Sequence, residues 1–229
     1  MYNENELSIL RLTDSYVHEY SSEAIRSGSI HEGSHGEDHG RRVGGLSRII
    51  AIGEGQNPYL PTLAGFIHDL GRAKTDDPRS KNSQHGILSI EIARDFLEEL
   101  PISHTERDLI IEAVEDHPFL NNKVRRNGLV EILQDADRCD GLGPITPIKV
   151  AQYKPLWPLH PEHICQEIPD QLGENLFDQF VFVREWYDML WTKTARNMIK
   201  NDVEFLDEYM KRYNDQLKWY QQAYTDTWE

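Results

Sequence analysis

Apolar residues recur three or four positions apart along most of the chain, which is the spacing of amphipathic α-helices. Alternating apolar and polar runs, which would indicate half-buried strands, are scarce. The pattern therefore predicts an all-α protein. We expect helices over about residues 5–26, 38–53, 61–71, 84–100, 103–117 and 127–139, and two helices or one long kinked helix over 179–222.

Single residues set several of these limits. Pro61 suits the first turn of a helix and Gly71 suits a C-terminal cap, so the third helix is expected to lie between them. Pro101 ends the fourth helix, because a residue before proline is pushed out of helical geometry. Ser103, followed three residues later by Glu106, predicts a capping box at the start of the fifth helix.

The domain organisation follows from length and from proline content. At 229 residues the chain can bury a substantial core, and we expect a single helical domain over 1–229 with its core at about 20–142. Residues 141–178 carry six of the eleven prolines and little periodicity, which predicts a loop-rich lid or insertion over 143–178. The helices at 179–222 are expected to form a C-terminal extension that packs on the core.

Net charge, cysteine count and the lack of long apolar runs exclude several classes of partner and site. The net charge of −15 repels a phosphate backbone, so duplex nucleic acid is not an expected partner. Two cysteines, Cys139 and Cys165, are too few for a disulfide framework or a thiolate zinc site. No run of about 18 apolar residues and no signal-peptide pattern occurs, so we expect a cytoplasmic protein without a membrane partner.

Several expected helices place an ionisable side chain on their apolar face. His68, His117 and Asp137 each follow an apolar residue of the stripe by four positions, and His39 precedes one by four. A single buried histidine is most often a hydrogen-bonded core residue. Inward-facing groups on four helices are better explained by convergence on a shared cation, because buried charges persist when they are paired or coordinate a metal.

The positions of the aspartates also support a shared cation site. Asp137 lies near the end of its helix, where the helix dipole disfavours a carboxylate by roughly 0.3–1 kcal/mol, and Asp135 and Asp140 lie close by. A bound cation would stabilise all three. Asp69, next to His68, has two oxygens that can bridge two ions. Nitrogen and oxygen ligands without thiolate suit Mn²⁺, Fe²⁺, Co²⁺, Ni²⁺ or Mg²⁺ in an open site.

These segments carry a resemblance. EDHGRRV with His39, AGFIHDLGR with His68 and Asp69, and LQDADRCDGLG with Asp137 together resemble the H, HD and D motifs of the HD-domain superfamily of metal-dependent phosphohydrolases. The resemblance implies a helical core in which these four residues bind a divalent metal ion. The segments SHGEDH, DHPF and TKTAR are similar to small bacterial HD hydrolases of the nucleotide-pyrophosphatase-like group.

The resemblance also implies roles for other residues. His85 is similar to an extra histidine of two-metal relatives, and with His117 it would complete a second metal site or contact the substrate; an ordinary surface or capping role is the alternative for His85. Arg72 follows HDLG where many two-metal relatives have HD followed by Gly-Lys, so it takes over a phosphate contact or caps a helix end. The remaining candidate phosphate contacts are Arg42, Arg196 and His35, and a solvated side chain is the alternative for each.

The resulting hypothesis is a metal-dependent phosphohydrolase with one or two divalent ions. It would cleave a small phosphorylated substrate, a nucleotide or a phosphodiester, with metal-activated water that Asp69 positions or deprotonates. Two alternatives remain open. Some superfamily relatives use a similar six-ligand set for di-iron oxygenase chemistry, and a metal-containing ligand-binding module without catalysis would need the same residues.

Overall fold

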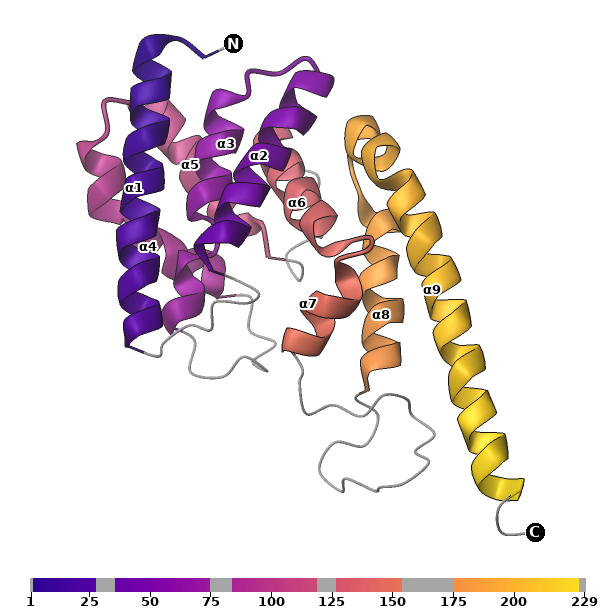
Figure 1. Ribbon diagram of the computed structural model, residues 1–229. Helices are drawn as coiled ribbons and strands as arrows, with labels where there is room; N and C mark the ends of the chain where they lie inside the picture. Colours follow the sequence, from indigo (N-terminus) through magenta and orange to yellow (C-terminus); the bar gives the residue numbers. More distant parts are fainter. Residues whose placement is uncertain (1, 28–35, 75–83, 119–126, 154–174, 227–229) are drawn as a thin grey trace. The chain divides into compact units, whose positions relative to one another are not determined.

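A computed structural model describes residues 2–27, 36–74, 84–118, 127–153 and 175–226. In these residues every regular element is helical (Figure 1), so the prediction of an all-α protein is confirmed. The chain divides into two compact units, Met1–Asp140 with Leu190–Ala195, and Gly141–Met189 with Arg196–Glu229. Among the described helices, none is long and apolar enough to cross a membrane.

The first unit holds most of the elements. They are α1 (Glu4–Arg26), α2 (Glu37–Gly53), α3 (Tyr59–Ile67), the 3₁₀ helix η1 (Leu70–Lys74), α4 (His85–Glu99), α5 (His104–Asp116) and α6 (Gly128–Gly141), which enters the second unit at its last residue. The capping box predicted for the fifth helix is present, because the Ser103 hydroxyl accepts from the Glu106 amide and the Glu106 carboxylate accepts from the Ser103 amide.

The expected helix at 61–71 has Pro61 in its first turn, as predicted, but its C-terminal end is wrong. It begins at Tyr59 and ends at Ile67, so Pro61 is its third residue, and two turn residues separate it from η1. The break lets Gly71 lie directly against the start of α4, where a Cβ atom would meet the carbonyl oxygen of His85 and lie 2.7 Å from the Ser89 nitrogen. The Gly71 amide donates to the Ser89 hydroxyl at 2.8 Å. This docking on α4 replaces the last helical turn that the sequence pattern predicts.

Helix α3 is the centre of the first unit, with α1, α2 and α5 packed against it. The crossing of α2 and α3 is close, because a Cβ atom on Gly65 would lie 2.6 Å from the Cα atom of Gly44. Large aliphatic side chains fill the surrounding core, and Ile50, Leu63 and Ile67 are fully buried. The close crossing brings the first turn of α2 beside the end of α3, which are the two places where His39 and His68 lie.

The second unit contains α7 (Thr146–Tyr153), α8 (Leu176–Glu185), the 3₁₀ helix η4 (Trp186–Met189) and α9 (Lys193–Asp226), which begins within the first unit. Helix α7 falls in the segment expected to be loop-rich, and residues 154–174 of that segment lie outside the described residues. Between α8 and α9, the rings of Phe180, Tyr209 and Tyr213 pack together. The single domain, the lid and the packing of the C-terminal helices on the core stay predictions.

Candidate metal centre

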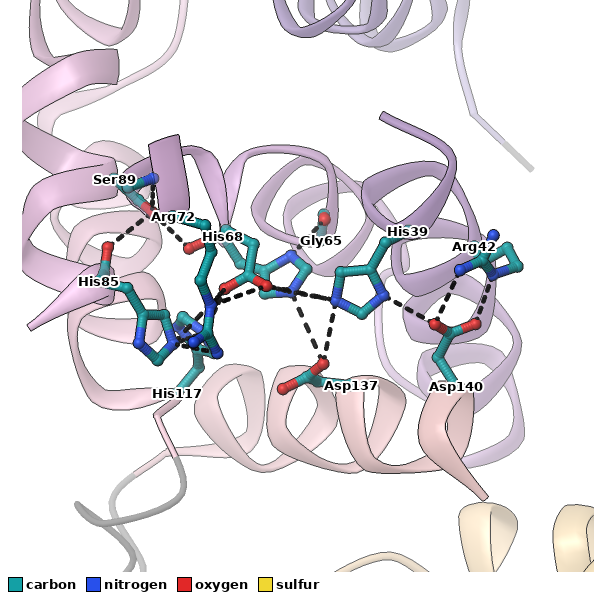
Figure 2. A network of polar contacts seen from close by, with 12 residues as sticks. His39, Arg42, Gly65, His68, Arg72, His85, Ser89, His117, Asp137 and Asp140 are labelled. Carbon is teal, nitrogen blue, oxygen red and sulfur yellow. Dashed lines mark hydrogen bonds and ion pairs between the residues drawn. The ribbon is translucent and has the colours of Figure 1, made fainter. Parts of the chain in front are cut away.

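Four side chains from three parts of the first unit converge, and we call them the first cluster: His39 at the start of α2, His68 and Asp69 in the turn after α3, and Asp137 on α6. Figure 2 labels His39, His68 and Asp137, whose side chains point toward one another. The Nε2 atom of His39 lies 3.2 Å from Nε2 of His68, 3.3 Å from Oδ1 of Asp137 and 3.5 Å from Oδ2 of Asp69. Atoms that share one ion at about 2.1 Å lie roughly 3.0–3.4 Å apart, so these spacings suit a common cation.

Asp69 also belongs to a second cluster with His85, the first residue of α4, and His117, which caps the end of α5. The two imidazole Nε2 atoms lie 3.1 Å apart, and they lie 3.5 Å and 3.6 Å from Oδ1 of Asp69. Asp69 therefore turns one oxygen to each cluster, as a bridging carboxylate does. Within the described residues, the compact ligand groupings are His39–His68–Asp137 and His68–Asp69–His117.

Three of the imidazoles are held with one nitrogen facing the clusters. His68 and His117 each donate from Nδ1 to the carbonyl oxygen three residues earlier, at 2.8 Å and 2.6 Å, and His39 donates from Nδ1 to Asp140 at 2.7 Å. Carbonyl and carboxylate oxygens only accept, so the Nδ1 atoms carry protons and the Nε2 atoms are left to bind a ligand. All three rings are at most 3% exposed, which fixes these orientations.

Electrostatics in the first cluster favour a cation. Burial alone would lower the pKa of His39, but hydrogen bonds to Asp137, Asp140 and Asp69 outweigh it and raise that pKa to about 10. Burial would raise the pKa of Asp137, yet hydrogen bonds to His39 and His68 hold it well below its usual range. Without metal, the carboxylates thus keep a proton on His39 as their counter-charge, and a divalent ion would supply more positive charge at the same place.

The second cluster has the opposite electrostatics. Burial is the largest cause that lowers the pKa of His85, to about 2, and the charges of His117 and Arg72 lower it further. Burial also lowers the pKa of His117. Both rings are therefore neutral near pH 7, and each keeps a lone pair that can accept a hydrogen bond or bind a cation.

Arg42, an expected phosphate contact, lies on the outer side of His39, and its role toward phosphate stays a prediction. Its Nε and one terminal nitrogen donate to the two oxygens of Asp140 at 2.6 Å and 3.2 Å, while Asp140 accepts from His39. The sequence interpretation did not assign this role to Asp140. The available signal was its spacing, because Asp140 follows Asp137 by one helical turn and so shares its face of α6.

The hypothesis that one cation stabilises all three carboxylates of α6 is wrong for Asp135. This side chain is fully buried and accepts from the amides of Trp191 and Thr192, at 2.9 Å and 2.7 Å, and from the Thr192 hydroxyl at 2.7 Å. Burial raises the pKa of Asp135, and these hydrogen bonds oppose the rise. Thr192 also accepts from the Ala195 amide, so part of the TKTAR segment fastens the start of α9 to α6.

The other expected phosphate contacts are placed differently. Arg72 lies at the centre, with Nε 3.3 Å from both oxygens of Asp69 and a terminal nitrogen 3.3 Å from Nε2 of His85. Arg196 belongs to the second unit, where its carbonyl accepts from the Tyr187 hydroxyl at 3.5 Å. His35 lies outside the described residues. Their roles toward phosphate stay predictions.

An all-helical unit whose histidines and aspartates meet around α2, the α3–η1 turn and α6 is the architecture that the motifs predicted. Residues 36–142 match the family model of the HD domain. This segment of the chain is thus similar to an HD domain, and it contains both clusters.

Solved structures share the fold. A Lactobacillus plantarum protein is 19% identical with a TM-score of 0.66, over 95% of this chain and 99% of that chain. Bacillus subtilis YpgQ in complex with ADP is 18% identical with a TM-score of 0.66, over 93% and 96%. An HD-superfamily hydrolase from Bacillus thuringiensis is 17% identical with a TM-score of 0.66, over 93% and 98%. A search of curated proteins found no match.

Proposed function

We propose that the protein is a divalent-metal-dependent phosphohydrolase that acts on a small phosphorylated substrate, a nucleotide or a phosphodiester. One observation carries the proposal: four ligand atoms of the first cluster meet from separate elements, and the two imidazoles among them have their Nδ1 atoms engaged elsewhere. The four ligands are imidazole nitrogens and carboxylate oxygens without thiolate, and ions such as Mg²⁺ and Mn²⁺ that prefer octahedral coordination would keep open positions for water beside them. The side chain of Asp137 is 33% exposed, so a path to solvent remains on its side of the cluster.

The residues around the clusters have separate proposed roles in metal binding, proton transfer and phosphate contact. His39, His68, Asp69 and Asp137 would hold the ion through the atoms that face one another. The bound ion would lower the pKa of a coordinated water and polarise a phosphoryl oxygen. Asp69 is proposed to take the proton of the attacking water on Oδ1, the oxygen turned away from His39. Arg72, beside that oxygen, would donate to the phosphoryl oxygens, for which a planar guanidinium is well shaped.

The nucleotide assignment rests on chemistry and on a relative. Net charge is −15, so an anionic substrate needs local positive charge, which the ion and Arg72 would supply. YpgQ, which shares the fold, has been solved with ADP. Nucleoside phosphates are therefore the first substrates to assay, followed by phosphodiesters.

A substrate panel with Mn²⁺, Co²⁺, Ni²⁺ and Mg²⁺ tests the proposal. The double variant His68→Ala/Asp69→Ala should lose turnover by about hundredfold or more, because it removes two ligands and the proton acceptor. His18→Ala on α1, whose side chain is 58% exposed, is the matched control and should keep full activity. Equal turnover of the double variant and the wild type would remove this mechanism.

The two alternatives give different results in the same preparations. A di-iron oxygenase would hold two iron ions per chain and consume oxygen with an iron-dependent visible spectrum. A ligand-binding module would bind a nucleotide tightly with metal present and release it unchanged. Metal-dependent phosphate release from one substrate of the panel, without oxygen uptake, supports the hydrolase.

A further inference from the structure

The side chain of Arg72 lies beside His85 of the second cluster, as Figure 2 shows, and its guanidinium carries a permanent positive charge. We propose that its guanidinium takes the place of a second metal ion, so that the centre binds one ion, at the first cluster, with Arg72 as the other cation of the substrate site. The inference rests on the proposed function for the role of the single ion. It goes beyond that function by fixing the number of ions and the residue that limits it.

The geometry of the second cluster supports this substitution. Its three facing atoms, Oδ1 of Asp69 and Nε2 of His85 and His117, lie 3.1–3.6 Å apart, which would suit an ion. Arg72 approaches two of these three atoms at 3.3 Å. A guanidinium has no acceptor, so the His85 Nε2 atom must be the acceptor of that contact. A lone pair that accepts from Arg72 is not available to a metal ion at the same time.

Charge balance leads to the same conclusion. Asp69 is 6% exposed in its side chain and is the carboxylate that both clusters share. An ion held by Oδ2, together with a guanidinium whose Nε lies 3.3 Å from both oxygens, would place two cations on one carboxylate, which resembles the charge arrangement of a two-metal site. A third cation would be repelled at short range. Arginine does not lose its proton in proteins, so this second charge is present whatever the metal supply.

The backbone around Arg72 is held in place. The Gly71 amide donates to the Ser89 hydroxyl at 2.8 Å, and that hydroxyl lies 2.6 Å from the His68 carbonyl oxygen and 2.8 Å from the His85 carbonyl oxygen. The Arg72 amide donates to the Asp69 carbonyl at 3.0 Å. One serine on α4 thus links the backbone of the first cluster to that of the second, and η1 presents Arg72 from a fixed position.

The test is the number of Mn²⁺ ions per folded chain, measured by mass spectrometry of the metal after stripping, reloading and desalting, with calorimetry for affinity. The wild type should hold one ion, and Arg72→Ala should hold two. Adding His117→Ala to Arg72→Ala should return the count to one. Arg72→Lys, which keeps the charge, should hold one. Arg41→Ala is the matched control and should hold one ion, because Arg41 on the exposed surface of α2 pairs with Asp14 of α1.

Electron paramagnetic resonance measures the number of neighbouring ions independently. Two Mn²⁺ ions held on either side of Asp69 in Arg72→Ala would show exchange coupling, and a single ion would not. Two ions in the wild type would overturn the inference even if Arg72→Ala did not fold. A count of one in folded Arg72→Ala would overturn it too. No ion in any of the proteins would refute the proposed function as well, whereas a single ion in the wild type without turnover would refute only the hydrolase assignment.

Discussion

Replacing Asp140 with alanine should weaken metal binding although Asp140 belongs to neither cluster. Its carboxylate is 4% exposed and accepts three hydrogen bonds, from Nδ1 of His39 at 2.7 Å and from Arg42 at 2.6 Å and 3.2 Å. Loss of such an outer partner typically weakens a metal site by about 10–100-fold, or roughly 1.4–2.8 kcal/mol. The buried Nδ1–H left without its acceptor should lower the free energy of unfolding by about 1–3 kcal/mol.

Calorimetric titration with Mn²⁺ measures the first effect, and urea unfolding of the metal-free protein measures the second. Asp14→Ala is a close control. Asp14 of α1 accepts from Arg41 of α2 with the same two-point geometry, at 2.7 Å and 3.1 Å, but is 38% exposed. It should leave metal affinity unchanged and alter stability by no more than about 0.5 kcal/mol. If Asp140→Ala binds Mn²⁺ as tightly as Asp14→Ala, Asp140 does not orient His39.

Three further predictions concern the protonation of His39, the crossing of α2 and α3, and the contact of Thr192 with Asp135. His39 has a pKa of about 10 without metal and must release a proton when it binds an ion, so Mn²⁺ affinity measured by calorimetry should rise about tenfold per pH unit from pH 7 to 9. In chelator, the contribution of His39 to the free energy of unfolding should be complete below about pH 6.5 and lost as the pH rises through 10. Flat calorimetric and unfolding profiles would contradict both expectations. Gly65→Ala places a Cβ 2.6 Å from the α2 backbone and should cost about 1–3 kcal/mol in urea unfolding, whereas Gly45→Ala, with open space around it, should be neutral or stabilising by up to about 1 kcal/mol. Thr192→Val should lower the free energy of unfolding by about 1–3 kcal/mol, because buried Asp135 loses a hydrogen-bond donor, and it should leave Mn²⁺ affinity unchanged. A large loss of Mn²⁺ affinity would show that this contact also supports the metal centre.

Much of the helical framework was predictable because it depends on neighbours in sequence. The capping box at Ser103 and the stop at Pro101 set the limits between α4 and α5 as expected. The end of α3 was not predictable in this way. Gly71 is a good cap by local rules, but its missing Cβ serves a close approach to α4, so the helix ends earlier and His68 and Asp69 lie in a turn.

For the site too, the features that depend on neighbours in sequence were predictable, and those that depend on helix packing were not. Helical spacing alone predicted that His39, His68, His117 and Asp137 face inward, since the face of a helix that meets the core is set by its apolar residues. Which of these groups meet, and through which atoms, depended on how the helices cross. The spacing of Asp140 from Asp137 placed both on one face of α6, but it did not show that Asp140 would orient a ring 101 residues away.

The sequence by itself determined the all-α framework, the inward-facing histidines and aspartates, and the acidic surface, because each depends on residue type and on periodicity within one segment. Only the tertiary structure decided that Arg42 pairs with Asp140, that Asp135 fastens α9, and that Arg72 lies on Asp69. Side-chain partners are chosen by distance in space, and packing sets those distances between residues that the chain keeps far apart.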